Sequence, residues 1–341
     1  MKKQKIITCT GYGGTGSSAI TDLLKEFKNV YSYGDFEFNF LFFPNGIRDL
    51  EYGVVENNER NITDYRVKQF RKKMDYLYNT KINSYRKIFG QNFKIYTDEY
   101  IKNLVEIQWK GFSSKDILEE TFFKKFLYYT ERFIQKKIFK QKEGGAKFYK
   151  NKNSMSYTYL SKEEFYSETK EYLNKLFITL LSEEKEYLAL DQLVPSSNIN
   201  KYLDYFYDLK VVVVDRDPRD VYLLNEVFWH EPWIPSKDIN IFIKWYKLLR
   251  EHQQTELINE NKKQILRIKF EDMIFNYEET LNKVLSFLEV SKEKHIRKKE
   301  FFNPEISIKN TRLFKNYPQY QGNIKLIEKE LGEFCYNFPE K

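Results

Sequence analysis

The sequence is poor in cysteine and in long apolar runs, and each shortage excludes a class of protein. Its 341 residues hold only Cys9 and Cys335, which excludes a disulfide framework and a cysteine-ligated metal centre. No run approaches the ~18 uncharged apolar residues of a membrane-spanning helix. The basic N-terminus leads into a short apolar run and then glycines, which predicts a strand rather than a signal peptide. We therefore expect a soluble, cytoplasmic protein without a transmembrane segment.

Charge is balanced rather than of one sign. The formal net charge is +8, from 57 basic and 49 acidic residues. Such an excess can steer polyanionic substrates toward a site, although the abundance of Lys, Asn, Ile, Tyr and Phe explains most individual lysines by composition alone. No predicted helix shows a clean basic stripe, so we do not expect nucleic acid as a partner.

The start of the chain predicts a strand, a glycine-rich loop and a helix in direct succession. The apolar run KIITCT at 5–10 is followed by GYGGTGSS at 11–18, and apolar side chains then recur at helical spacing over 19–27. Backbone N–H groups and the positive end of such a helix converge on one point, where an anion binds. The residues expected to hold a phosphorylated ligand are Gly11, Gly13, Gly14, Thr15, Gly16, Ser17 and Ser18.

Three phosphate-binding patterns fit this loop. Gly11, Gly13 and Gly16 match the dinucleotide fingerprint G-x-G-x-x-G. Gly11 and Gly16 also have the P-loop spacing, but Ser17 stands where the P-loop has lysine. The loop further resembles the 5′-phosphosulfate loop of sulfotransferases, [K/R]-[S/T]-G-[S/T]-[S/T], except that Gly14 replaces the basic residue. The loop alone leaves the three patterns open.

A second motif, far along the chain, favours the sulfotransferase pattern. Residues 209–214 (LKVVVV) predict a buried parallel strand, and Asp217 and Pro218 suit the N-cap and first turn of the helix that follows. The run RDPRD resembles the 3′-phosphate motif of sulfotransferases. That resemblance implies that Arg216 grips the 3′-phosphate of the sulfate donor, 3′-phosphoadenosine 5′-phosphosulfate. Arginine suits this role because its planar fork binds phosphate bidentately and stays charged.

A third segment, ILRIKF followed by Glu271 and Asp272, resembles the YEDL strand-to-helix junction of the same family. The chain thus resembles sulfotransferases of the bacterial carbohydrate type at three motifs in the family's order. The family places serine eight residues after the motif arginine, where this chain has Leu224, so Asn225 is the candidate second contact. A basic loop near the C-terminus closes over the 3′-phosphate in the family, which implies a donor contact for Arg312.

Acidic residues at strand ends are candidates for proton transfer. Residues 29–33 predict a second strand, and Glu37 follows it near the ligand crevice at the strand ends of an open α/β sheet. A dinucleotide enzyme would use Asp35 or Glu37 on a ribose hydroxyl. Carbohydrate sulfotransferases often use Glu to deprotonate the acceptor, which favours Glu37 as the catalytic base, with His230 as the second choice.

The chain is predicted to be a single P-loop-like α/β domain over 1–341, with a large helical insertion at 60–185. A mostly parallel central sheet with flanking helices is expected to use strands near 5–10, 30–33, 187–190, 210–215 and 264–268. The insertion carries Phe122, Phe126, Tyr129 and Phe133 on one face of a helix, a stripe typical of a core-facing side.

The predicted function is metal-free transfer of a sulfuryl group from 3′-phosphoadenosine 5′-phosphosulfate to a carbohydrate hydroxyl, on a polysaccharide or glycolipid. Two alternatives stay open. One is a P-loop kinase, because the strand at 211–215 is similar to a Walker B strand, although the P-loop lysine is missing. The other is a non-catalytic nucleotide-binding protein that retains the fold. The sequence leaves the oligomeric state open.

Overall fold

The computed structural model describes residues 3–82, 84–111, 113, 116–140 and 154–340. The chain divides into two compact units. The first, here the sheet unit, comprises Met1–Phe43 and Leu173–Lys341, and the second, the insert unit, comprises Pro44–Tyr172. The single domain with an insertion at 60–185 stays a prediction.

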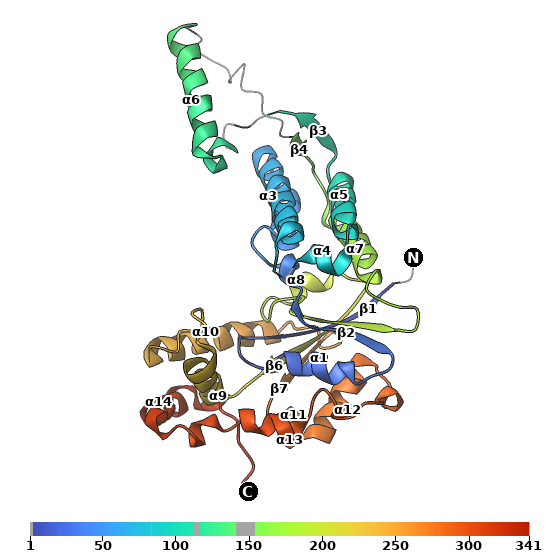
Figure 1. The fold of residues 1–341 in the computed structure, drawn as a ribbon, viewed down its shortest axis with the longest axis vertical. Helices are drawn as coiled ribbons and strands as arrows, with labels where there is room; N and C mark the ends of the chain where they lie inside the picture. Colours follow the sequence, from blue (N-terminus) through green and yellow to red (C-terminus); the bar gives the residue numbers. More distant parts are fainter. Residues whose placement is uncertain (1–2, 83, 112, 114–115, 141–153, 341) are drawn as a thin grey trace. The chain divides into compact units, whose positions relative to one another are not determined.

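Five strands form the central sheet of the sheet unit, in the order β2-β5-β1-β6-β7 (Figure 1). Their bounds are Lys5–Gly11 for β1, Val30–Glu37 for β2, Tyr187–Asp191 for β5, Asp208–Asp215 for β6 and Ile265–Lys269 for β7. Every pair of neighbours is parallel. The five expected strands and the mostly parallel α/β class are therefore confirmed. Because β1 is the middle strand, the glycine loop that follows it lies at the centre of the side of the sheet where the carboxyl ends of the strands meet.

Helices flank this sheet. In the sheet unit they are α1 (Ser18–Lys25), α8 (Asn200–Leu203), α9 (Pro218–Leu223), α10 (Ile239–Leu257), α11 (Asp272–Phe275), α12 (Tyr277–Leu288), α13 (Pro304–Ser307) and α14 (Gln321–Leu331). A π-helical turn, Leu224–Trp229, continues α9. The N-cap at Asp217 and the proline in the first turn of α9 are confirmed: the Asp217 side chain accepts a hydrogen bond from the N–H of Arg219.

The insert unit is mainly helical. It contains α2 (Ile47–Glu51), α3 (Arg60–Asn79), α4 (Tyr85–Phe89), α5 (Asn92–Leu104) and α6 (Phe122–Lys137), and α7 (Lys162–Ile178) runs from it into the sheet unit. A small antiparallel pair joins β3 (Ile107–Lys110) to β4 (Ser154–Tyr157). Within the described ranges, none of the helices is long and apolar enough to cross a bilayer.

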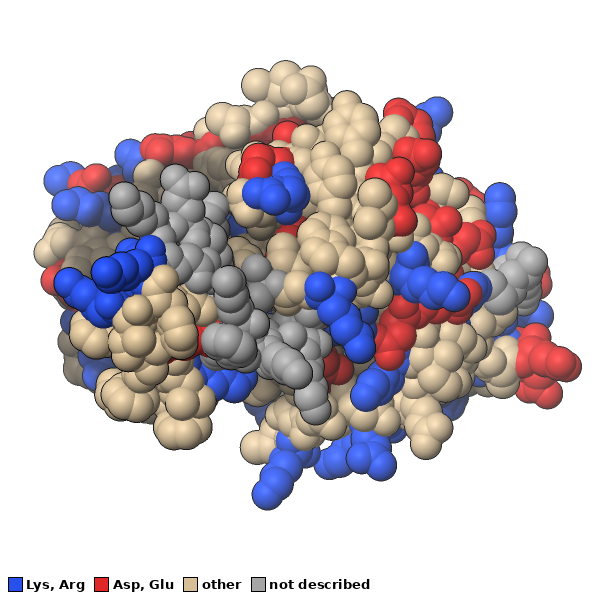
Figure 2. Space-filling view, turned by 90° about the horizontal axis from the view of Figure 1, so that it is seen from above, with Lys and Arg blue, Asp and Glu red and all other residues tan. Residues whose placement is uncertain are grey.

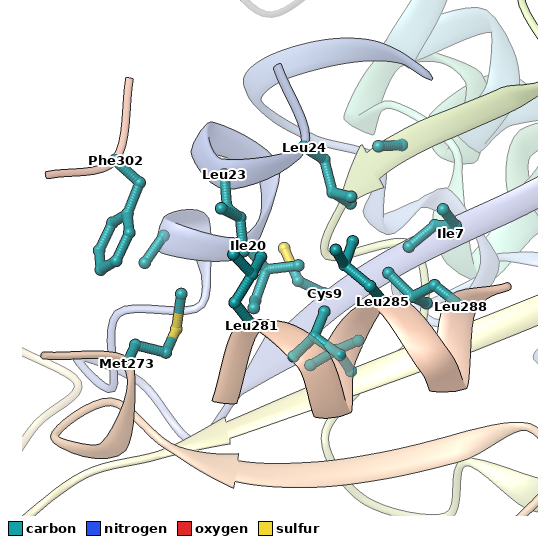
Figure 3. Close-up of a cluster of buried hydrophobic side chains, with 14 of the residues drawn as sticks. Ile7, Cys9, Ile20, Leu23, Leu24, Met273, Leu281, Leu285, Leu288 and Phe302 are labelled. Carbon is teal, nitrogen blue, oxygen red and sulfur yellow. The ribbon is translucent and has the colours of Figure 1, made fainter. Parts of the chain in front are cut away.

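The core of the sheet unit packs the strand that precedes the glycine loop against the helix that follows the loop. Ile7 and Cys9 of β1 pack against Ile20 and Leu24 of α1 and against apolar residues of α12, among them Leu285 (Figure 3). The apolar side of α1 thus faces the sheet, as the sequence predicts.

A second apolar cluster of the sheet unit joins α9, α10 and α14. On the face drawn in Figure 2, Lys and Arg side chains are separated by uncharged and acidic ones.

Replacing Leu24 by Ala tests this packing. Leu24 is fully buried in the cluster that joins α1 to β1 and α12, so the substitution leaves a cavity and should destabilise the protein by about 2–5 kcal/mol. Leu326→Ala, at a 39% exposed position of α14, is the matched control and should change little. Urea unfolding followed by circular dichroism measures both. Equal shifts in the two variants would contradict the assignment of Leu24 to the core.

Candidate functional site

The carboxyl ends of the strands surround a cavity of about 1350 Å³ in the sheet unit. This volume exceeds the ~300–1,000 Å³ of typical small-molecule sites and has room for a nucleotide and a second substrate. Its lining combines the whole glycine loop with polar and aromatic residues from later segments. They include Glu37, Asp191, Gln192, Arg216, Leu224, Trp229, Trp233, Phe270, Lys309 and Asn310.

The glycine loop presents an array of hydrogen-bond donors. Gly13, Gly14 and Gly16 adopt φ angles of +86°, +68° and +80°, which only glycine takes readily. Among the described residues, none accepts a hydrogen bond from the backbone N–H groups of 13–17. The Thr15 hydroxyl is also buried without a partner there. Together with the N-terminus of α1, these groups form an array of donors of the kind that suits an anion.

Tyr12 anchors the loop to the sheet. Its hydroxyl accepts a hydrogen bond of 2.7 Å from Nη1 of Arg267 on β7. The Arg250 guanidinium of α10 lies 4.0 Å from the centre of the Tyr12 ring. Burial raises the pKa of Tyr12 to about 12, so the phenol stays neutral and the two arginines hold it in place. The flexible glycines on either side of Tyr12 are thereby fixed at one point.

Arg216 reaches the loop from the end of β6. Its Nη1 donates to the carbonyl oxygen of Gly14 at 3.3 Å, and its Nη2 donates to the carbonyl oxygen of Asn310. The guanidinium lies 4.5 Å from the ring centre of Phe270. Its Nε is buried and has no hydrogen-bond partner among the described residues. Arg216 therefore places a positive charge and an unused donor beside the anion site.

Two buried carboxyl groups moderate this charge. Burial raises the pKa of Asp220 to about 7, while the positive charge of Arg216 opposes the rise. Burial likewise raises the pKa of Glu271 to about 7, although Glu271 accepts a hydrogen bond from the N–H of Asp217 at 2.9 Å. Burial also lowers the pKa of Arg216, and these acids counter that fall. The guanidinium is thus only partly neutralised by the protein.

The other residues of the RDPRD motif fix the C-terminal part of the chain. Asp217 accepts hydrogen bonds from the Arg219 side chain. Asp220 accepts from the backbone N–H groups of Arg312 and Leu313, at 2.9 and 2.8 Å. This pair of hydrogen bonds holds the segment that brings Lys309 and Asn310 to the cavity. Only the first arginine of the motif faces the ligand space.

A pair of carboxyl groups lies at the ends of β2 and β5. Glu37 and Asp191 are partners in the strand register, and both line the cavity. Cys9 donates its thiol hydrogen to Oδ1 of Asp191 at 3.0 Å. Burial raises the pKa of Asp191 to about 6, and the negative charge of Glu37 adds to the rise. Glu37 itself is exposed to solvent. The buried acid of the pair thus holds a proton to higher pH than an ordinary aspartate, while the other acid is exposed to solvent.

Gln192 links this carboxyl pair to the glycine loop. Its Nε2 donates to the Ser17 hydroxyl oxygen at 3.1 Å, and its Oε1 accepts from the Thr10 hydroxyl at 3.0 Å. Gln192 adopts a φ of +50°, an uncommon angle for a residue with a side chain. The bridge fixes the start of α1 relative to β5.

Two indole rings cover the loop. A Cβ atom on Gly13 would lie 2.1 Å from the Trp233 ring, and one on Gly14 would lie 2.7 Å from the Trp229 ring. The missing basic residue at Gly14 therefore has a physical reason. That position combines a left-handed backbone with a tryptophan where a side chain would begin.

Three predicted site residues do not line the cavity. Asn225 is buried, and its Nδ2 donates to the carbonyl oxygens of Glu231 and Ile234 and to the hydroxyl of Ser236. It therefore shapes the turn that carries Trp233. His230 is exposed, with a φ of +54°, at the end of the π-helical turn. Neither side chain is among the described residues that surround the ligand space.

Arg312 points away from the cavity. Its Nη2 donates to the carbonyl oxygen of Pro339 at 2.5 Å, and its guanidinium stacks on Phe275 and Phe338 at 5.0 and 5.1 Å. From the same C-terminal loop, Lys309 lines the cavity instead. The sequence places a basic loop here but cannot tell which of its side chains faces inward.

Sequence reasoning missed the aromatic cover. Trp229 and Trp233 are two of only four tryptophans in the chain and stand four positions apart, which is the one signal that could have found them. Leu224 does line the cavity, at the position where the resemblance expects serine, so the position is occupied but its hydroxyl is absent.

Asp191→Asn should stabilise the protein at high pH. The pKa of Asp191 is raised from an ordinary 3.8 to about 6 in the folded state, so folding disfavours its ionised form. The resulting penalty is absent below about pH 4 and complete above about pH 6–7, where removing the charge should gain roughly 2–3 kcal/mol. Asp204→Asn, at an exposed position, is the control. Unfolding at about pH 4 and pH 8 measures the difference, and a gain independent of pH would contradict the raised pKa.

Comparisons with known proteins complete the description. The sequence matches no protein-family model and no curated protein. Among solved structures it is similar to the sulfotransferase domain of the Synechococcus PCC 7002 olefin synthase, with 13% identity and a TM-score of 0.40 over 99% of this chain and 98% of that one. It is also similar to sulfotransferase STF9 from Mycobacterium avium, with 12% identity and a TM-score of 0.37 over 92% of this chain and 69% of that one.

A third similar structure is mouse sulfotransferase SULT7A1 complexed with PAP, with 17% identity and a TM-score of 0.24 over 37% of this chain and 49% of that one. The solved structures named here are thus sulfotransferases, the family that the motifs of this chain resemble. Because the TM-scores are 0.40 or less, this likeness carries no argument about activity.

Proposed function

We propose that this protein transfers a sulfuryl group from 3′-phosphoadenosine 5′-phosphosulfate to a hydroxyl group of a carbohydrate. The observation that carries the proposal is the contact between Arg216 and Gly14, which joins two motifs 202 residues apart in one cavity. The donor carries anionic groups at both its 5′ and 3′ positions and needs a site for each. The glycine loop and Arg216 supply two such sites side by side.

The glycine loop is the proposed site of the 5′-phosphosulfate. Its unused N–H groups, with the hydroxyls of Thr15, Ser17 and Ser18, would hold the phosphate, and the N-terminus of α1 favours negative charge there. The same groups stabilise the charge that develops on the bridging oxygen as the sulfuryl group leaves. They would take over part of the role of the basic residue that Gly14 replaces.

Arg216 is the proposed site of the 3′-phosphate. Its Nε is buried without a partner among the described residues, and an oxyanion there would satisfy it. Lys309 is the other basic side chain among the described residues of the cavity lining, and it precedes Asn310, whose carbonyl oxygen contacts Arg216. We therefore assign Lys309, in place of Arg312, as the second cation for the donor.

Glu37 is the proposed base. The acceptor oxygen attacks sulfur, the bond between sulfur and the bridging oxygen breaks, and adenosine 3′,5′-bisphosphate leaves with the electron pair. Glu37 takes the hydroxyl proton and later releases it to solvent, which its exposed position allows. Asp191 replaces His230 as the second candidate, because Asp191 lines the cavity and has a pKa of about 6.

The aromatic lining supports a carbohydrate acceptor. Trp229, Trp233 and Trp245 all line the cavity, and Trp229 and Trp233 are 46% and 56% exposed. Flat aromatic faces and acids in the same cavity suit a sugar ring, which offers C–H groups on its faces and hydroxyls at its edge. One observation favours a second candidate, nucleotide binding without turnover: Gly14 provides no basic side chain for the leaving phosphate.

Ligand-induced thermal shifts test the donor site. Adenosine 3′,5′-bisphosphate should raise the melting temperature, whereas ATP with Mg²⁺ and NAD should not. Arg216→Lys retains the charge but loses the fork, and should weaken bisphosphate binding roughly tenfold or more. Lys309→Ala should weaken it roughly threefold to tenfold, since one charge is lost near the phosphate.

Arg312→Ala is the matched control, because it removes a cation from the same loop whose side chain points away. Its bisphosphate affinity should equal that of the wild type. A shift with ATP or NAD and none with the bisphosphate would overturn the proposal in favour of a kinase or a dinucleotide enzyme. A loss caused by Arg312→Ala and not by Lys309→Ala would reverse their assignment.

Glu37→Gln tests the base. The variant should bind the bisphosphate normally and lose roughly 10²-fold or more in kcat, because the carboxylate that accepts the proton is gone. His230→Ala should stay within about twofold of the wild type. The assay follows sulfate transfer from the donor to a panel of glycosides with free hydroxyls. If Asp191→Asn abolishes transfer while Glu37→Gln retains it, the base is Asp191. Donor binding without transfer to any acceptor would favour the binding protein.

A further inference from the structure

Helix α6 of the insert unit exposes its apolar side to solvent. The sequence predicts that its aromatic stripe faces a core, and this prediction is wrong. Phe122, Phe126 and Phe133 are 86%, 58% and 61% exposed, whereas Gln135 and Tyr128 on the other side are 1% and 8% exposed. A helix of a soluble protein normally does the reverse, because burying the apolar side is what stabilises it.

The exposed apolar surface is wide. A second apolar stripe lies about 100° around the helix from the first. Its members are also exposed: Phe123, Leu127, Ile134 and Ile138. The two stripes, with Thr130 and Lys137 between them, together cover about half of the helix circumference. An apolar surface of this extent on one helix marks an interaction site rather than scattered surface residues.

The charges of α6 indicate which partner covers this surface. The helix carries five basic residues, Lys124, Lys125, Arg132, Lys136 and Lys137, against the single acidic Glu131. Two copies of the chain meeting through α6 would bring two such positive segments together, since a symmetric contact pairs a patch with itself. A narrow apolar stripe suits a protein groove, whereas a wide arc with Lys125 and Lys136 along one border and Lys137 within it suits a planar anionic surface.

We propose that α6 is an interfacial anchor that lies on an anionic phospholipid bilayer. Its aromatic side chains enter the boundary between headgroups and acyl chains, and its lysines contact lipid phosphates. Lys124 also pairs with Glu120 at 2.8 Å, at the start of the helix, and Arg132 donates to Oε1 of Gln135 at 3.3 Å, so the proposed lipid contacts are Lys125, Lys136 and Lys137. The inference is independent of the proposed sulfuryl transfer.

Co-sedimentation with vesicles tests the anchor. The full-length protein should bind vesicles of phosphatidylglycerol and phosphatidylcholine in equal parts, and binding should weaken as salt rises. The double variant Phe126→Ser/Phe133→Ser should bind at least about tenfold more weakly, because two large apolar side chains no longer enter the bilayer.

The matched control is Tyr76→Ser/Ile95→Ser, which removes two apolar side chains of similar exposure, 64% and 54%, from α3 and α5. It should bind vesicles like the wild type, and both double variants should keep the wild-type melting temperature. Equal binding to pure phosphatidylcholine vesicles, or no binding at low salt, would overturn the proposal. So would a dimer in sedimentation velocity that the Phe126/Phe133 variant abolishes, because the occupant would then be a second copy.

Discussion

The buried guanidinium of Arg216 is the interaction on which the proposed donor site depends. It links the glycine loop, the end of β6 and the C-terminal segment, through the carbonyl oxygens of Gly14 and Asn310 and the ring of Phe270. A buried cation costs several kcal/mol unless its surroundings compensate it. Here carbonyl oxygens compensate it only in part, and Asp220 and Glu271 are themselves driven toward the neutral form by burial. An anionic ligand would complete the balance, so the same arrangement that holds the loop together favours phosphate.

Much of the site is built by residues that do not face it. Asp220 fixes the backbone beside Arg312, and Asn225 fixes the turn that bears Trp233. Tyr12, itself part of the cavity lining, is held between Arg250 and Arg267 and so fixes the glycine loop. These contacts explain how a loop of left-handed glycines can keep one shape. Gly14 stands where the sulfotransferase loop that this chain resembles has a basic residue, and here the Trp229 ring occupies the space in which a side chain would begin.

The sequence predicted the features that depend on local pattern. Apolar runs located all five strands of the sheet, and Asp217 with Pro218 located the start of α9. It could not predict features set by long-range packing. The chemistry of Asn225 and Arg312 suits a phosphate, but their side chains instead donate to the carbonyl oxygens of Ile234 and Pro339. The stripe of α6 was expected to be buried because periodicity reports which side of a helix is apolar and not what lies against it.

The central claim is that the glycine loop and Arg216 bind the two ends of one nucleotide. A crystal structure of the protein with adenosine 3′,5′-bisphosphate tests it most directly. The account predicts the 5′-phosphate on the backbone N–H groups of 13–17 and the 3′-phosphate on Arg216, with Lys309 beside it. A nucleotide bound elsewhere, or bound in the cavity with neither phosphate on these groups, would contradict it.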